Sequence, residues 1–148
     1  MSKTVKIICS VIIAGLIFLG GVFAGTVSNA EVTKEIKIGY QNDGNPDRVD
    51  YHKVYTDSEN PLIMDNFLMI YLNWEKVDNV NVDLESPDLY IELNNPKDSV
   101  GLIDSKLWFD NDVAIIGRRV GESWDQVIFY EIDESDAEYI KKTIEYEG

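Results

Sequence analysis

Residues 105–117 read Ser-Lys-Leu-Trp-Phe-Asp-Asn-Asp-Val-Ala-Ile-Ile-Gly, which is two largely apolar runs separated by a short polar one. Runs rich in aromatic and β-branched residues are typical of β-strands. Asp110-Asn111 suits the two-residue turn of a hairpin. The stretch therefore predicts an antiparallel hairpin formed by Ser105–Phe109 and Asp112–Gly117, and a sheet as the centre of the fold.

A second hairpin is predicted upstream of this one. Polar and apolar residues alternate over Glu35–Tyr40 and again over Arg48–Thr56, and turn-forming residues fill positions 42–47. Alternation in the second of these strands places the odd-numbered residues from Val49 to Tyr55 on one side. Leu89–Leu93 and Gln126–Ile132 predict two further strands.

Two helices complete the expected fold. Asn60-Pro61 suits a helix start, and the apolar spacing that follows predicts a helix from Pro61 to about Glu75, with a buried strand over Phe67–Leu72 as the alternative. Ser135-Asp136-Ala137-Glu138 matches the capping box that opens a helix, which would run to about Tyr146. The order β-β-α-β-β-β-β-α predicts an α+β fold, an antiparallel sheet with two helices on one face.

The first 30 residues predict export. Lys3 and Lys6 precede an uncharged apolar run over residues 7–25, and Ser28 and Ala30 are the small residues that a signal peptidase accepts before its cut. An uncleaved membrane anchor is the alternative, because 19 apolar residues can just span a bilayer. In either case the remainder faces outward, as a secreted protein cleaved near Ala30 or as a domain on one transmembrane helix.

The expected organisation is a signal peptide or anchor over residues 1–30 and one exported acidic domain over residues 31–148. The whole chain has 13 Lys plus Arg against 27 Asp plus Glu, a net charge of -14. Such a surface repels phosphate, so the charge excludes a nucleic-acid binder. Cys9 lies inside the apolar run, and one Cys and one His exclude a thiolate zinc site and a disulfide framework. Membrane contact is expected only through residues 7–25, if they are retained.

Short motifs in the second half resemble a known family. Pro87-Asp88-Leu89-Tyr90 opens a strand, Leu107-Trp108-Phe109-Asp110 precedes a turn, and Phe129-Tyr130-Glu131-Ile132 precedes the closing helix. With Ala114-Ile115-Ile116, these motifs resemble the YhfM-like domain of small exported proteins from Gram-positive bacteria. The resemblance covers the C-terminal half and implies export and an envelope location rather than a particular chemistry. The lipid-attachment cysteine of such proteins is missing here.

A calcium site is a candidate at the first turn. Calcium loops place carboxylates at alternating positions around a glycine. With Asp43 and Gly44 at the fifth and sixth loop positions, Asp47 takes the ninth and Asp50 the twelfth, but Gly39 at the first position offers no side-chain oxygen. The alternative interpretation is an acidic hairpin turn without a metal.

Catalytic chemistry has few candidates. His52 is the only histidine, and Asp50 is the nearby acid that could orient it as a general base. No Gly-x-Ser-x-Gly or comparable nucleophile motif is present, and with 27 acidic residues no carboxylate pair is singled out. A small hydrolase is therefore kept as an alternative, and no catalytic residue or cofactor is assigned.

The favoured partner contact is the segment after the central hairpin. Arg118 and Arg119 are adjacent arginines between Gly117 and Gly121, and Trp124 follows. Arg and Trp are frequent interface hot spots, so we expect a protruding loop that binds a protein of the cell envelope or the medium. The alternative is that both arginines pair with nearby acids. The sequence thus favours a non-enzymatic exported binding or accessory domain.

Overall fold

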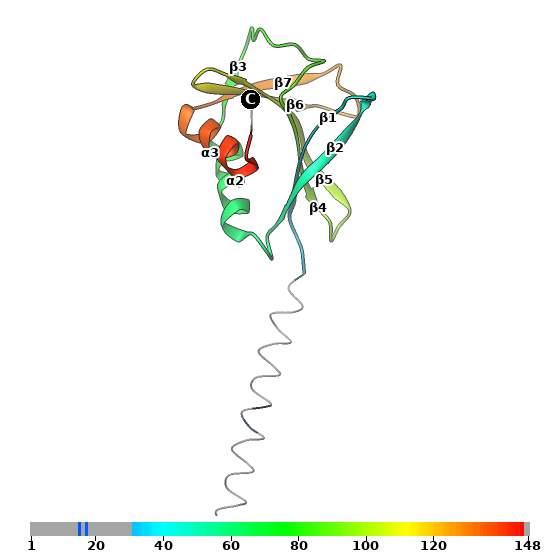
Figure 1. The fold of residues 1–148 in the computed structure, drawn as a ribbon, viewed down its shortest axis with the longest axis vertical. Helices are drawn as coiled ribbons and strands as arrows, with labels where there is room; N and C mark the ends of the chain where they lie inside the picture. The colour runs from blue at the N-terminus through cyan, green and yellow to red at the C-terminus, as the bar shows by residue number, and fades with distance from the viewer. Residues whose placement is uncertain (1–14, 16, 18–30, 147–148) are drawn as a thin grey trace, which may run out of the picture. The chain divides into compact units, whose positions relative to one another are not determined.

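The computed structural model describes residues 15, 17 and 31–146 of the chain (Figure 1). Residues Val32–Gly148 form one compact unit. Its elements, in order, are β1 (Glu35–Asn42), β2 (Asn45–Thr56), α2 (Pro61–Asn73), β3 (Glu75–Val77), β4 (Leu89–Asn95), β5 (Val100–Asp110), β6 (Val113–Arg119), β7 (Val127–Ile132) and α3 (Glu134–Ile144).

The strands form one seven-stranded sheet in the order β2-β1-β4-β5-β6-β7-β3. Every neighbouring pair is antiparallel. The predicted α+β class is therefore confirmed, with one strand more than expected. The addition is β3, three residues that pair with β7 at the sheet edge. Its sequence, Glu-Lys-Val, is too short and too polar to predict a strand.

Both helices pack on the same face of the sheet (Figure 1). Met64, Phe67 and Ile70 of α2 and Ile140 of α3 join the apolar side chains of the sheet in one continuous core. Phe67 is 1% exposed and meets the ring of Tyr139 edge-on. At about 25 cal/mol per Å² of buried apolar surface, this layer is the main favourable term in folding.

The predicted helix over Pro61 to about Glu75 is confirmed as α2, and the strand alternative over Phe67–Leu72 is wrong. Pro61 occupies the first turn, where its missing N–H costs nothing. The helix ends at Asn73, two residues before the predicted end, because Trp74 is extended and leads directly into β3.

The capping box predicted for the last helix is wrong. α3 begins at Glu134, and its N-cap is Asp133, whose side chain accepts a hydrogen bond from the Asp136 backbone N–H at 2.9 Å. An N-cap three residues before the donor satisfies an otherwise unpaired helix N–H. The helix ends at Ile144, where Glu145 takes a left-handed conformation with a φ of 58°.

The side-chain alternation expected along the second strand is interrupted. Ile38 pairs with Lys53 but Gly39 pairs with Tyr51, so His52 is the extra residue of a β-bulge. The bulge reverses which face the following odd-numbered positions occupy. Tyr55 donates to the Thr143 carbonyl on the helical face, whereas Tyr51 lies on the opposite face.

The predicted export segment over residues 1–30 lies outside the described residues, apart from positions 15 and 17. Within the described part of the chain, no helix has both the length and the apolar character needed to cross a bilayer. Cleavage, anchoring and membrane contact through residues 7–25 therefore stay predictions.

Candidate binding site on the polar face of the sheet

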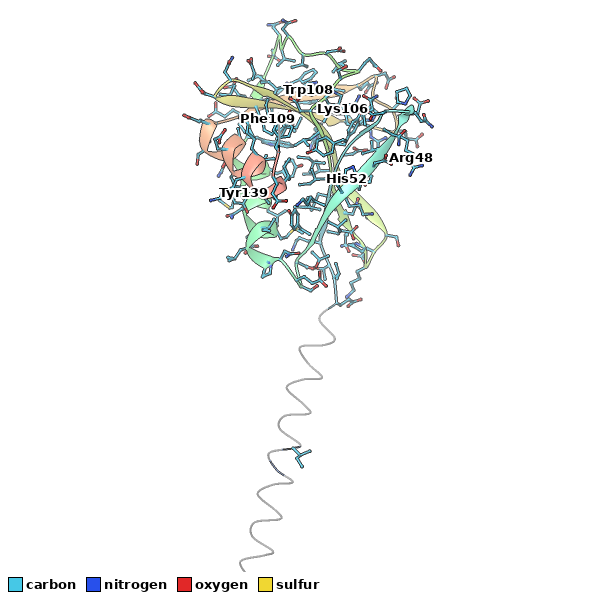
Figure 2. All side chains as sticks on the ribbon, viewed as in Figure 1. Arg48, His52, Lys106, Trp108, Phe109 and Tyr139 are labelled. Carbon is cyan, nitrogen blue, oxygen red and sulfur yellow. The ribbon has the colours of Figure 1, made fainter. Side chains whose placement is uncertain are left out.

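The face of the sheet that turns away from α2 and α3 is covered in part by the segment between β3 and β4. Two side chains of β5 fix this segment by donating hydrogen bonds to two consecutive backbone carbonyls. Trp108 Nε1 donates to Asp83 O at 2.8 Å, and Lys106 Nζ donates to Leu84 O at 2.7 Å. Figure 2 labels both side chains. None of the helices in residues 31–146 lies over this polar face.

Beside the covered part lies a cavity of about 320 Å³, here called the polar hollow. Its charged lining is Asp47, Glu85, Glu92, Asp104 and Lys106. Its aromatic lining is Tyr51, Tyr90 and Trp124. These side chains come from β2, β4, β5 and the two connections before β4 and β7, so residues that are far apart in sequence converge on one place.

Lys106 is the central cation of the polar hollow. It is only 6% exposed although it is charged. Its Nζ lies 4.7 Å from the ring centroid of Trp124 and 5.5 Å from that of Tyr90, within range of cation–π attraction. Desolvation lowers the pKa of Lys106, while the carboxylates of Glu85, Asp104 and Asp83 oppose that shift. The Lys106 ammonium group is thus held against the rings of Tyr90 and Trp124 of the same molecule.

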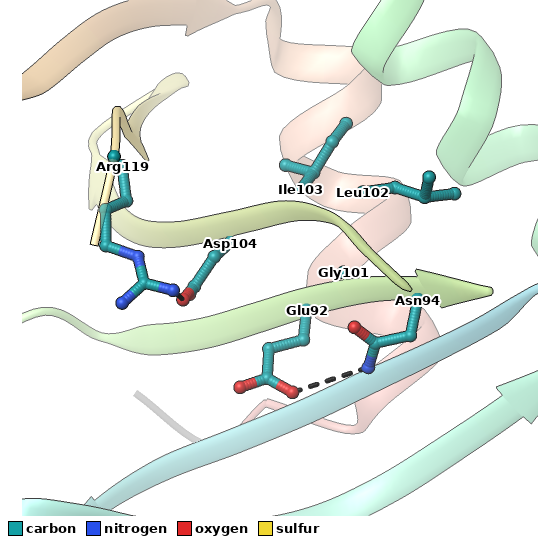
Figure 3. A pocket seen from close by; sticks show the side chains of 8 residues that line it. Glu92, Asn94, Gly101, Leu102, Ile103, Asp104 and Arg119 are labelled. Carbon is teal, nitrogen blue, oxygen red and sulfur yellow. Dashed lines mark hydrogen bonds and ion pairs between the residues drawn. The ribbon is translucent and has the colours of Figure 1, made fainter. Parts of the chain in front are cut away.

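Glu92 and Asp104 form the boundary of the polar hollow with a second cavity of about 250 Å³. Arg119 reaches Asp104, with 2.6 Å between Nη2 and Oδ2, and Asn94 donates to Glu92 (Figure 3). On the other side, Tyr51 donates its hydroxyl to Glu92. Desolvation raises the pKa of Asp104, and the Glu92 carboxylate adds to that effect while Arg119 opposes it.

Two acidic residues lie at the rim of the polar hollow. Within the described part of the chain, the carboxylates of Asp47 and Glu85 accept no hydrogen bond and form no ion pair. Both residues are exposed. Carboxylates left open beside aromatic rings attract a positively charged group, since the rings favour a cation and the carboxylates pair with it.

The predicted partner residues are partly brought together. Arg118 and Arg119 are not in a protruding loop, which corrects the prediction, because they are the last two residues of β6 and pair with Ile128 and Val127 of β7. Arg119 turns to the polar face, pairs with Asp104 and lies 5.7 Å from the Trp124 ring. Arg118 lies 5.8 Å from the Tyr130 ring, and its buried Nε has no hydrogen-bond partner.

The three aspartates proposed for calcium lie along the first hairpin. Asp43 is in the exposed turn and Asp47 is at the rim of the polar hollow. Asp50 accepts from Asn42 Nδ2 and pairs with Arg48 Nε at 3.0 Å. Among the described residues, no group of three or more His, Cys, Asp or Glu side chains could hold a metal ion. Calcium binding at this hairpin stays a prediction.

His52, the proposed general base, is the exposed bulge residue of β2 (Figure 2). Its ring lies 5.7 Å from that of Tyr40. The acid expected to orient it, Asp50, instead binds Asn42 and Arg48. The arrangement around His52 therefore provides no oriented acid–base pair.

Sequence reasoning missed most of the polar hollow. Glu92, Asp104 and Lys106 are charged residues within two strands whose other face is apolar, and their positions alternate with Ile91, Leu93, Ser105 and Leu107. Alternation alone indicates an outward face, which is the ordinary place for charge. The available signal was Trp108, two residues after Lys106 and on the same face of the strand, since a large aromatic ring is unusual on a fully solvated face.

No family model, curated protein or solved structure matches this chain. The likeness to the YhfM-like domain therefore rests on the sequence motifs alone.

Proposed function

We propose that this protein is a non-enzymatic, exported binding or accessory domain that acts at the outer face of the membrane or in the medium. The polar hollow is its contact site for a protein of the envelope or the surroundings. One observation carries this proposal: the sheet face without helices gathers aromatic and charged side chains around a cavity of about 320 Å³.

The composition of this surface supports binding. Aromatic and arginine side chains are enriched where protein partners make their strongest contacts. Trp124 and Arg119, two of the three residues that the sequence nominated, lie at this place and contact each other. The third, Arg118, is on the opposite face of β6 and is left out of the proposed contact.

Site-specific photo-crosslinking in the native host tests this function. One variant carries a benzoylphenylalanine at Glu85, on the rim of the polar hollow, and a matched variant carries it at Asp65, an exposed acid of α2. We expect one discrete crosslinked protein from position 85 and none from position 65. Equal products from both positions, or a product from position 65 alone, would overturn the proposal.

A small hydrolase is the second candidate, and one observation favours it. Glu92 and Asp104 face each other across neighbouring strands, and burial raises the pKa of Asp104 toward the range in which a carboxylic acid donates a proton. A panel of glycoside and ester substrates tests this candidate. It requires turnover that is lost on Asp104→Asn and kept on Asp112→Asn, an exposed acid at the far turn of β5.

A further inference from the structure

We propose that the polar hollow binds a basic, extended segment of the partner, with a lysine or arginine side chain entering the cavity. This inference rests on the proposed function and names the chemistry of the partner. Three features support it: the charge balance inside the cavity, the rings that line it and the different lining of a second acidic cavity elsewhere on the sheet.

The charge balance of the polar hollow is negative. Four carboxylates line it against one ammonium, that of Lys106. The Lys106 Nζ is already bound to the Leu84 carbonyl and two rings, and Asp104 is paired with Arg119. Glu92 accepts hydrogen bonds only from the neutral groups of Tyr51 and Asn94, and Glu85 acts on Lys106 at a distance without forming an ion pair. Asp47 forms no ion pair among the described residues. A cation entering the cavity therefore meets three carboxylates that form no ion pair within the described part of the chain.

Tyr51 is the aromatic wall available to the apolar stem of an incoming basic side chain, since Lys106 and Arg119 already lie against the other rings. Lysine and arginine side chains bury their methylene groups on apolar surfaces, while the charged end group stays in contact with water or other polar groups. Lys106 does this inside the molecule, with its ammonium against Tyr90 and Trp124. Tyr51 is the remaining aromatic wall, and the bulge at His52 places it there.

Other ligand classes fit this cavity less well. An anion would be repelled by the carboxylates at the rim. A neutral sugar binds by stacking on an open ring face, but Lys106 and Arg119 already lie over the Trp124 ring. The strongly acidic character of the chain, with a net charge of -14, also favours association with a positively charged partner.

A second acidic cavity provides an internal control. It has about 560 Å³ and lies at the β3–β7 edge of the sheet, lined by acids that include Glu75, Asp112 and Glu131 and by no aromatic side chain. Glu75 and Glu131 are directly opposite each other. If negative charge alone attracted basic chains, this cavity would bind them as well as the polar hollow does.

Calorimetric titration of residues 32–148 with octalysine tests the inference, since every core residue that the structure describes belongs to this unit. Asp47→Asn/Glu85→Gln removes two charges from the polar hollow, and Glu75→Gln/Glu131→Gln removes two charges from the other cavity. We expect saturable binding that weakens about tenfold in the first variant, which corresponds to about 1.4 kcal/mol for the two exposed carboxylates together. The control variant should bind within about twofold of the unsubstituted protein.

Equal weakening in both variants would overturn the inference, because it would show attraction to overall charge rather than to this cavity. Absence of octalysine binding would overturn it as well. Neither result touches the proposed function, which the crosslink from position 85 tests without assuming that the partner is basic. A crosslinked partner whose contacting segment lacks Lys and Arg would contradict the inference and leave the binding function in place.

Discussion

Glu92 on β4 and Asp104 on β5 lie directly opposite each other in the sheet, and each is held by a different group. Tyr51 donates a hydrogen bond to Glu92, and Arg119 forms an ion pair with Asp104. Like charges placed directly opposite on neighbouring strands are destabilising. The repulsion between the two carboxylates is therefore reduced, because the Tyr51 hydroxyl donates to Glu92 and the Arg119 guanidinium pairs with Asp104.

Arg119→Gln should destabilise the protein in a pH-dependent manner. Burial raises the pKa of Asp104 above its usual value, and loss of Arg119 raises it further. A raised carboxyl pKa means that the folded state holds the proton more tightly, so the stability contributed by this group falls as pH rises through the folded pKa. We expect a loss of about 1–2 kcal/mol at pH 7 that shrinks as the pH approaches about 4.

Denaturant unfolding at several pH values measures this effect. Arg48→Gln is the matched control, because Arg48 pairs with Asp50 at a much more exposed place. The control should cost at most about 0.5 kcal/mol and show little change with pH. A loss for Arg119→Gln that stays constant from pH 4 to pH 7 would refute the role given to Asp104.

Lys106 should contribute through its stem as much as through its charge. Lys106→Met keeps the methylene contacts and loses the bond to Leu84, so we expect a cost of about 1 kcal/mol at neutral pH. Lys106→Ala also empties the space between Tyr90 and Trp124 and should cost about 2–3 kcal/mol. Urea unfolding of both variants gives these values, and equal losses would contradict the packing role.

The same lysine predicts a pH dependence at the basic end. Desolvation lowers the pKa of Lys106, so the folded state releases the proton before the unfolded state does. Its contribution to stability should therefore rise between the folded pKa and the unfolded value of about 10.4. Lys106→Met should lack this rise, which unfolding measured at pH 7 and pH 10 can detect.

Gly117 should be sensitive to the smallest substitution. A Cβ at this position would lie 2.9 Å from Trp108 Cζ3 and 2.9 Å from Val127 Cγ1, so the indole of Trp108 could not keep its place beside Gly117. We expect Gly117→Ala to cost about 1–3 kcal/mol. Gly101→Ala is the control, since its Cβ would meet only Asn94 Oδ1 at 3.6 Å. A thermal unfolding midpoint that is the same in both variants would show that Trp108 can shift freely.

The stability effects of Asp133 and Ser135 show which of the two residues caps α3. Asp133→Ala removes the acceptor for the Asp136 N–H and should cost about 1 kcal/mol. Ser135→Ala should change stability by less than about 0.3 kcal/mol, because Ser135 lies inside the helix and not at its cap. The opposite ranking in chemical denaturation would restore the capping box expected from the sequence.

Much of the fold could be predicted because strong local patterns decide it. The hairpin of β5 and β6 and the helix after Asn60-Pro61 follow from turn chemistry and apolar spacing. The predicted turn Asp110-Asn111 is wrong by one residue, because Asp110 still pairs with Val113 and the turn is Asn111-Asp112. The cap of α3 was placed two residues too late because Asp133 and Ser135 are both good N-cap residues. Local pattern cannot choose between them, since the choice depends on where β7 ends.

The site was harder to predict than the fold. A bulge at His52 depends on the register between β1 and β2, which a single strand does not reveal, and it moves Tyr51 to the polar face. Lys106 is buried only because residues 83 and 84 and the ring of Trp124 come over it from elsewhere in the chain. Contacts of this kind are fixed by tertiary packing and not by sequence periodicity.

An amide chemical-shift map of residues 32–148 titrated with octalysine tests whether a basic segment binds in the polar hollow. We expect saturable shifts that concentrate at Asp47, Tyr51, Glu85 and the strand residues around Glu92 and Asp104. Shifts centred instead on Glu75 and Glu131, or spread evenly over all acidic surfaces, would contradict it.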